Sequence, residues 1–223
     1  MTTVIARDVR RSPIHAWPQA HAAGWTASAN GAIPSAFNAT VPQGRQLMLS
    51  DRSLRQRFGC KGPTAEHWLR GAGLPPPAGA NRWYRLPGGE FVGRLATSEF
   101  LVEALGPDCS TVVNARSRCE ASDRASGVIP IARQDLVIEL TGSRLIGGLR
   151  ELCSVDFAPI VAVSSSTDGP VILTSMIGVP VVAVAWLRGG APVVTLWIDP
   201  SFAHYFWTTL LQVAADAGSG AAP

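Results

Sequence analysis

One stretch of the chain, residues 134–157, constrains the fold more than any other. It opens with alternating apolar residues, a period typical of a half-buried strand: Leu136, Ile138 and Leu140. A turn at Gly142 follows, and the hydroxyl of Ser143 can cap a helix. Leucines spaced by four and three residues then form one helical face: Leu145, Leu149 and Leu152. The stretch therefore predicts a strand, a glycine turn and a helix.

A weaker copy of this unit lies upstream, in residues 54–69. A short predicted strand runs into Gly62, and Pro63 suits the first turn of a helix because its missing N–H is not required there. Leu69 follows Gly62 at the same distance as Leu149 follows Gly142. The sequence thus predicts a duplicated βα unit inside one domain.

The composition is poor in charge. Charged residues are 16% of the 223 positions, against roughly 25% in soluble domains, and the mean hydropathy is +0.18. A large core under a small-residue surface would explain this, but a surface covered by other subunits is favoured. No apolar run is long enough for a membrane span. The arginines form no basic stripe, so neither a membrane nor nucleic acid is an expected partner.

The cysteines and the N-terminus favour the cytoplasm. The four cysteines form no C-x-x-C pair, which in a chain of this size indicates reduced thiols: Cys60, Cys109, Cys119 and Cys153. The first residues contain no apolar segment of the kind that an export signal requires. We therefore expect a cytoplasmic protein.

The sequence predicts that residues 1–46 form an extended N-terminal arm. Prolines and small residues give it no helical or strand period, yet large apolar residues punctuate it. The arm either lies across a partner or folds back onto its own domain. Candidate partner contacts are its aromatic residues and the pair that ends a later proline-rich loop: Trp17, Trp25, Phe37, Trp83 and Tyr84.

Residues 47–217 predict a single α+β domain, and residues 218–223 a flexible tail. Apolar patterns predict strands at 91–95, 99–105, 159–163 and 171–177, and a hairpin whose strands are 180–187 and 192–198. Helices are expected at 112–123 and after Asp199, with Pro200 in the first position. The expected fold class is α+β, with antiparallel sheets and helices on one face.

The sequence predicts no catalytic, cofactor-binding or metal-binding residues. It lacks the glycine-rich phosphate loops and the G-x-S-x-G motif of hydrolases, and its histidines are not spaced for zinc. Residues 141–143 could bind an anion at a helix start, although a plain turn is the simpler interpretation. Cys153 is expected to be inert packing and His204 a surface or interface residue.

Five segments resemble known families. Four are similar to the gamma subunit of heterotetrameric sarcosine oxidase: RSPIHAW (Arg11–Trp17), GSRLIGGLRELCSVDF (Gly142–Phe157), VILTSMIGVPVVAVAWL (Val171–Leu187) and WIDPSFAHYFWTTLL (Trp197–Leu211). The fifth, DRSLRQRFGCKGPTAEHWL (Asp51–Leu69), resembles the opening of the aminomethyltransferase of the glycine cleavage system, a wider relative of that subunit.

The resemblance implies an aminomethyltransferase-like (folate-binding) fold and a non-catalytic gamma subunit with no cofactor of its own. Its implied partners are the alpha, beta and delta subunits, which would carry FAD, FMN, NAD, tetrahydrofolate and zinc. Such complexes oxidatively demethylate sarcosine or a related secondary amine and pass the one-carbon unit to tetrahydrofolate. The chain is about half as long as the aminomethyltransferases and lacks a recognisable match to their catalytic aspartate segment.

Two other functions stay open. One is a free-standing folate-binding protein that uses the same fold for one-carbon transfer. The other is a small hydrolase with an unrecognised serine or cysteine nucleophile.

Overall fold

A ten-stranded antiparallel sheet is the framework of the chain. The computed structural model describes residues 11–16, 22–28, 31–37, 46–106, 109–122 and 126–219. The sheet has the order β3-β9-β12-β11-β10-β5-β6-β7-β4-β8. Its strands are β3 (Met48–Asp51), β4 (Arg57–Lys61), β5 (Arg82–Arg85), β6 (Glu90–Ala96), β7 (Glu99–Ala104), β8 (Ile129–Ile131), β9 (Leu136–Thr141), β10 (Asp168–Met176), β11 (Val179–Arg188) and β12 (Ala191–Ile198).

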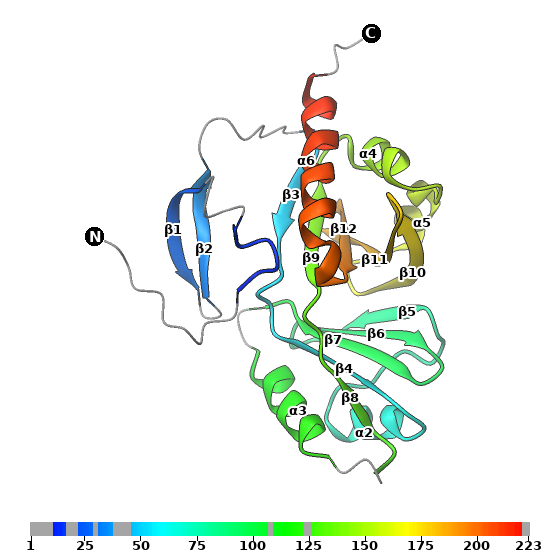
Figure 1. Ribbon diagram of the computed structural model, residues 1–223. Coiled ribbons are helices and arrows are strands. Elements are labelled where there is room, and N and C mark those ends of the chain that lie inside the picture. The colour runs from blue at the N-terminus through cyan, green and yellow to red at the C-terminus, as the bar shows by residue number, and fades with distance from the viewer. Residues whose placement is uncertain are drawn as a thin grey trace, which may run out of the picture.

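The sheet curls so that two five-strand halves face each other (Figure 1). The first half is β5-β6-β7-β4-β8 and the second is β3-β9-β12-β11-β10, joined by a short pairing of Asp168 with Tyr84 and of Pro170 with Arg82. An apolar cluster fills much of the space between the halves: Trp83, Phe91, Leu95, Leu101, Val137, Val171, Val184, Trp186, Val193 and Trp197. The inner face of the sheet is therefore largely core.

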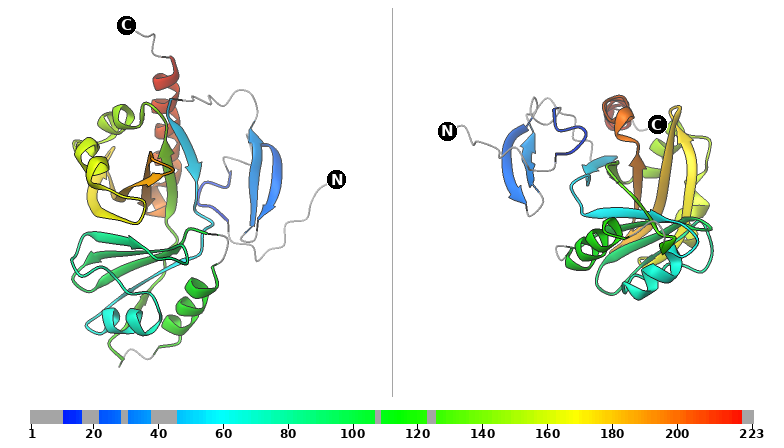
Figure 2. Two further views of the ribbon diagram at one scale, coloured as in Figure 1. Left: turned by 180° about the vertical axis from the view of Figure 1, so that it is seen from behind. Right: turned by 60° about the horizontal axis from the view of Figure 1, so that its bottom comes forward.

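The helices cover the outer face of the sheet. Helices α2 (Ala65–Gly71) and α3 (Ser110–Glu120) pack against the first half and bury Leu69 and Cys119 there. Helices α4 (Leu145–Leu152), α5 (Phe157–Val163) and α6 (Ala203–Ser219) pack against the second half, as Figure 2 also shows. The expected antiparallel α+β class with helices on one face is confirmed.

Both predicted strand–turn–helix units form. Gly62 and Gly142 follow β4 and β9 with φ values of +127° and +119°, a region that favours glycine. A Cβ on Gly62 would meet the carbonyl oxygen of Gly127, and one on Gly142 would meet that of Gln46. Each glycine thus permits a close backbone approach that fixes where the next helix starts.

The details of these units differ from the predictions. Helix α4 begins after Arg144 and receives no side-chain cap, so Ser143 is not its N-cap. Pro63 lies before the cap residue Thr64 and is outside the helix. Strand β9 is buried on both faces, because Val137 and Glu139 point into the space between the two halves. The half-buried strand was therefore a wrong prediction.

Residues 159–163 are helical and not the predicted strand. They belong to α5, whose start is fixed by the Asp156 carboxylate accepting a hydrogen bond from the Ala158 N–H. That cap supports a helix despite the β-branched residues that follow. At the C-terminus, Asp199 does cap as expected: it accepts from the Ser201 N–H and starts the 3-10 turn Pro200–Phe202 (η2) that leads into α6.

The N-terminal region contains structure that the sequence did not predict. Strands β1 (Ala22–Ser28) and β2 (Gly31–Phe37) form a two-stranded sheet separate from the ten-stranded one. Ile14 is buried in the core of the second half, so at this point the arm does fold back on its own domain. The limits 1–46, 47–217 and 218–223 stay predictions, and α6 reaches Ser219.

No helix within the described ranges has both the length and the apolar character needed to cross a bilayer.

Candidate functional site

A buried group of charges occupies the space between the two halves, next to the apolar cluster. At its centre the Glu103 carboxylate accepts hydrogen bonds from Arg57 Nε at 2.9 Å and Trp197 Nε1 at 3.0 Å on Oε2. Arg55 Nη1 donates to Oε1 of the same carboxylate at 3.3 Å. The side chains of Arg57 and Glu103 are both fully buried. This carboxylate belongs to β7, in the first half of the sheet.

Glu139 is the corresponding buried carboxylate of the second half. It accepts from Arg55 Nη2 at 2.7 Å, from Arg52 Nε at 3.0 Å and from Arg188 Nη2 at 2.7 Å. Burial raises the pKa of Glu139, but the attraction of Arg55, a hydrogen bond from Arg188 and the attraction of Arg52 outweigh burial and lower the pKa overall. The carboxylate is therefore held ionised at neutral pH.

Arg55 connects the two carboxylates. One of its terminal nitrogens bonds Glu103 and the other bonds Glu139, so a single guanidinium joins the first half of the sheet to the second. A carboxylate surrounded by guanidinium donors is a poor proton acceptor, because its negative charge is already stabilised. The arrangement is suited to holding two half-sheets together and not to general base catalysis.

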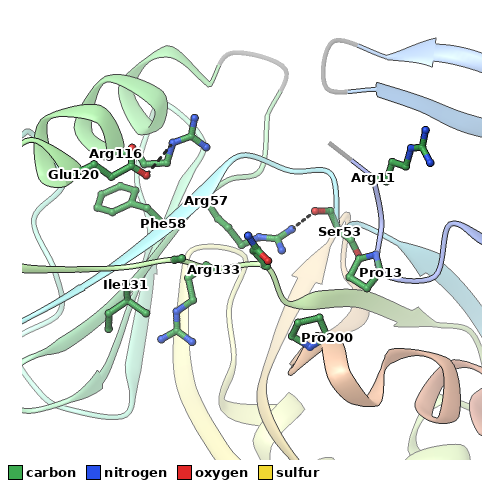
Figure 3. Close-up of a pocket in the computed structure, with 12 residues that line it drawn as sticks. Arg11, Pro13, Ser53, Arg57, Phe58, Arg116, Glu120, Ile131, Arg133 and Pro200 are labelled. Atoms are coloured by element: carbon green, nitrogen blue, oxygen red, sulfur yellow. Dashed lines mark hydrogen bonds and ion pairs between the residues drawn. The ribbon is translucent and has the colours of Figure 1, made fainter. Parts of the chain in front are cut away.

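A cavity of about 560 Å³ lies at the outer edge of this network (Figure 3). We call it the arginine cavity. Its lining residues come from the N-terminal segment, the residues before and in β4, α3, the end of β8 with the β8–β9 connection, and the start of η2: Arg11, Pro13, Ser53, Arg57, Phe58, Arg116, Glu120, Ile131, Ala132, Arg133, Gln134 and Pro200. Four of these side chains are cationic and one is acidic.

Arg57 is a rigid part of the cavity wall. Besides its bond to Glu103, its Nη1 donates to the Asp135 carbonyl at 2.8 Å, and its Nη2 donates to the carbonyls of Arg52 at 3.1 Å and Ser53 at 2.8 Å. Burial raises the pKa of the neighbouring Asp135 carboxyl, against the opposing attraction of Arg133 and Arg57. One oxygen of that carboxyl, Oδ2, is buried and makes no hydrogen bond.

The space between the two apolar inner faces is nearly full. A gap of about 10 Å³ remains there, bounded by residues that include Trp83, Trp186 and Trp197. That volume corresponds to about one water molecule, whereas ligand pockets usually measure several hundred Å³. Side chains of this chain therefore occupy the position in which a ligand between the half-sheets would have to sit.

Of the residues predicted as partner contacts, Trp83 and Tyr84 are those whose side chains the structure describes. Trp83 is only 1% exposed and stacks on Phe91 in the inner core, so it has no surface to offer a partner. Tyr84, the next residue, is 39% exposed and stays a candidate contact. Trp25 lies in β1 and Phe37 in β2, two strands of which the backbone is described. Trp17 lies outside the described residues.

The thiols are in packing environments. Cys60 and Cys119 are fully buried, and a hydrogen bond between them, with burial, raises the pKa of Cys60. Cys153 is partly buried and donates weakly to the Leu149 carbonyl. A raised pKa disfavours the reactive thiolate, so Cys60 is a poor candidate for the nucleophile of a hydrolase.

The other sequence candidates are placed as follows. The Arg144 N–H donates to the Gln46 carbonyl and the Leu145 N–H to the Gly142 carbonyl. The start of α4 thus uses its own chain as acceptor, as a plain turn does. His204 is exposed near the start of α6. Within the ranges that the structure describes, no group of three or more His, Cys, Asp or Glu side chains is placed to bind a metal.

Sequence reasoning missed every member of the buried charge network. A signal was present: Glu139 is the single charged residue of β9, and Glu103 follows the apolar run of residues 100–102 in β7. A charge is rarely buried without a partner. Arginines before and inside β4 supply that partner, but no pattern in a single sequence pairs residues that are far apart along the chain.

Comparison of the sequence with protein-family models and with curated proteins finds no match. Among solved structures, a chain of the heterotetrameric sarcosine oxidase from Corynebacterium sp. U-96, in complex with pyrrole 2-carboxylate, is similar with a TM-score of 0.67 and 20% sequence identity. That likeness covers 97% of this chain and 100% of the other.

The aminomethyltransferase T of the glycine cleavage system from Bartonella henselae is similar with a TM-score of 0.66 and 15% identity. The likeness covers 93% of this chain but 61% of the transferase, so the chain spans somewhat less than two thirds of that protein. At these identities the comparisons show a fold and no more. The chain therefore has the curled, antiparallel, aminomethyltransferase-like fold.

Proposed function

We propose that this chain is a non-catalytic subunit of a sarcosine-oxidase-type complex, in the place of the gamma subunit. The single observation that carries the proposal is the length of the structural match. The chain aligns from end to end with one chain of a heterotetrameric enzyme, but with only 61% of the aminomethyltransferase T of the glycine cleavage system. A chain that matches a whole subunit and only part of an enzyme is best explained as a subunit.

The interior of the chain supports this proposal. Tryptophan side chains fill most of the space between the half-sheets and leave a gap of about 10 Å³. Both interior carboxylates, those of Glu103 and Glu139, are neutralised by arginines. Such an interior stabilises a scaffold and provides no room for a reacting substrate. Exposed apolar side chains such as Leu173 and Val163, 55% and 70% exposed, are consistent with surfaces covered by other chains.

In the proposed complex, the other subunits do the chemistry. Alpha, beta and delta subunits are the proposed partners, and FAD, FMN, NAD, tetrahydrofolate and zinc are proposed to bind to them. The complex would oxidise sarcosine or a related secondary amine and pass the one-carbon unit to tetrahydrofolate. Exposed Tyr84 and the aromatic residues of the N-terminal region are the proposed contacts.

We further propose that the two half-sheets arose by duplication of one unit. In each, a strand leads through a glycine with positive φ into a helix, and the glycine approaches a carbonyl oxygen that precedes the outermost strand of that half. The strand order is also symmetrical about the β5–β10 junction, with five strands on each side. If the unit is duplicated, replacing Gly62 and replacing Gly142 should lower the stability of the fold by similar amounts.

Co-purification tests the proposed function directly. A tagged copy expressed in its native host is expected to bring down partner chains, to show the absorption of bound flavin, and to demethylate sarcosine or a close analogue. The tagged chain expressed alone is expected to be colourless and inactive. Recovery of the single chain without partners from the native host would contradict the proposal.

A second candidate function, a free-standing folate-binding protein, is favoured by the likeness to aminomethyltransferase T. Calorimetric titration of the purified chain with tetrahydrofolate distinguishes the two. Heat of binding by the isolated chain would support folate binding, and its absence would remove this candidate.

A further inference from the structure

The arginine cavity has a surface whose charge is unbalanced. Arg11, Arg57, Arg116 and Arg133 line it, and Glu120 is the single acidic residue among the lining side chains. A concave surface with an excess of guanidinium groups concentrates a positive potential, because field lines are focused in a cleft with low-dielectric walls. Its volume of about 560 Å³ is within the usual range for a small-molecule site.

The four arginines differ in how far their donors are already used. Arg57 is fixed by Glu103 and by three backbone carbonyls, so it contributes charge to the wall but few free donors. Arg133 donates to Glu99 at 3.0 Å. Arg116 donates through Nη1 to Gln56 at 3.0 Å. Arg116 thus lines the cavity with one described hydrogen-bond acceptor, Gln56.

The Nε of Arg116 is buried and has no hydrogen-bond acceptor. The nearest carboxylate oxygen, Glu120 Oε1, lies 3.9 Å away, which is beyond hydrogen-bond distance. A buried donor without an acceptor costs free energy. An oxyanion in the cavity would give the Arg116 guanidinium, which lines it, a negatively charged acceptor, and the fork of an arginine is well shaped for the two oxygens of a carboxylate or phosphate.

Part of the wall is apolar. Pro13, Phe58, Ile131 and Pro200 come from four different segments, and Phe58 lies beside Arg116, whereas Pro13 and Pro200 lie on the opposite side (Figure 3). A bare inorganic ion would leave these surfaces in contact with water. A ligand with a flat apolar body and one oxyanionic group would contact both parts of the wall.

We propose that the arginine cavity binds a small organic anion, with its carboxylate or phosphate group on Arg116 and its apolar body against Phe58 and Ile131. The proposal is independent of the role of the chain in a complex. An acidic side chain of a partner protein is the competing occupant. A small anion is favoured because the cavity is recessed between five segments of one chain and has the volume of a small-molecule pocket.

Benzoate, benzamide and inorganic phosphate are suitable probes for the full chain. Benzoate and benzamide have nearly the same shape, so a difference between them reports the charge, and a difference between benzoate and phosphate reports the apolar body. We expect benzoate to bind more tightly than both others, and its affinity to fall as salt is added. In ¹H–¹⁵N spectra the Nε–H signal of Arg116 is expected to shift on binding, because its guanidinium gains an anionic neighbour.

Three substitutions on α3 give signed expectations. Arg116→Gln should weaken benzoate binding about tenfold or more, since a hydrogen bond to a charged group is lost. Glu120→Gln should tighten it by about threefold, because an exposed competing carboxylate is removed. Arg118→Gln is the matched control: it changes the net charge as Arg116→Gln does, but Arg118 faces Trp68 and does not line the cavity.

The outcome is decided even if Arg116→Gln fails to fold, because the wild-type titrations and the Glu120→Gln variant test the same site. Equal binding of benzoate and benzamide, or weaker binding after Glu120→Gln, would overturn the proposal. So would saturation by an acidic peptide under conditions in which benzoate leaves the Arg116 Nε–H signal unmoved.

Discussion

Arg57 and Glu103 are direct cross-strand partners on β4 and β7, and their ion pair of 2.9 Å is fully shielded from solvent. Arg55 extends this pair to Glu139 in the other half of the sheet. The two halves are therefore joined in their interior by charge as well as by the neighbouring tryptophans. A buried pair of this kind adds little net stability, but removing one partner leaves an uncompensated charge in the core.

Glu103→Gln should destabilise the chain by about 3–5 kcal/mol, because the buried guanidinium of Arg57 loses its counter-charge. Urea unfolding at neutral pH measures the change. Glu99→Gln is a control on the same strand: it removes the pair with Arg133 at 3.0 Å, but Glu99 is 38% exposed, so the cost should stay below about 1 kcal/mol. Equal losses for the two variants would show that the Arg57–Glu103 pair is not buried as described.

Glu139 should make the fold sensitive to acid. Its pKa is lower in the folded chain than its ordinary value, so the unfolded chain binds the proton more tightly. The resulting stability is present in full above the unfolded pKa of about 4.3 and is lost as the pH falls through the folded pKa. Glu139→Gln should remove this part of the pH dependence in urea unfolding, whereas exposed Glu151→Gln on α4 should keep it.

Asp135 should change the pH dependence of stability in the direction opposite to Glu139. Burial raises its pKa in the folded chain, so the folded state holds the proton more tightly, and stability is lost as the pH rises through the folded pKa. Asp135→Asn should therefore be more stable than wild type at neutral pH. The difference should disappear below the unfolded pKa of about 3.9, where both side chains are neutral. A destabilised Asp135→Asn at neutral pH would mean that the charge attracts Arg133 and Arg57 more strongly than burial opposes it.

Gly62→Ala and Gly142→Ala should each be strongly destabilising. An alanine there adds about 1–2 kcal/mol for the left-handed backbone, and its Cβ collides with a carbonyl oxygen of Gly127 or Gln46. Gly73→Ala separates the two effects, because Gly73 has a φ of +79° and open space around its Cβ position. It should lose only the backbone part. Thermal unfolding of the three variants measures this, and similar losses in all three would contradict the close approach.

The elements that local chemistry determines could be predicted from the sequence. The β9–α4 unit, the β11–β12 hairpin and the Asp199 cap follow from a two-residue period, a glycine turn and a side-chain cap. The short edge strand β8 (Ile129–Ile131) could not be predicted, since three residues are too few to show a strand period. It forms because it pairs with β4. Residues 159–163 were predicted as a strand because three of them are β-branched, but the Asp156 cap starts a helix there.

The candidate site was less predictable than the fold. The arginine cavity gathers side chains from positions 11 to 200 of the chain, and only the curl of the sheet brings them together. Trp83 was expected at a surface because it follows a proline-rich loop, but strand pairing turns it into the core. Its neighbour Tyr84 points to the opposite face by the alternation of a strand and is exposed.

We propose that this chain works inside an assembly with other chains. Native mass spectrometry of the tagged chain, purified gently from its native host, tests it most directly. We predict one dominant species in which a copy of the 23.5 kDa chain is accompanied by larger chains and bound flavin. A dominant species with the mass of the single chain, free of partners and flavin, would contradict the account.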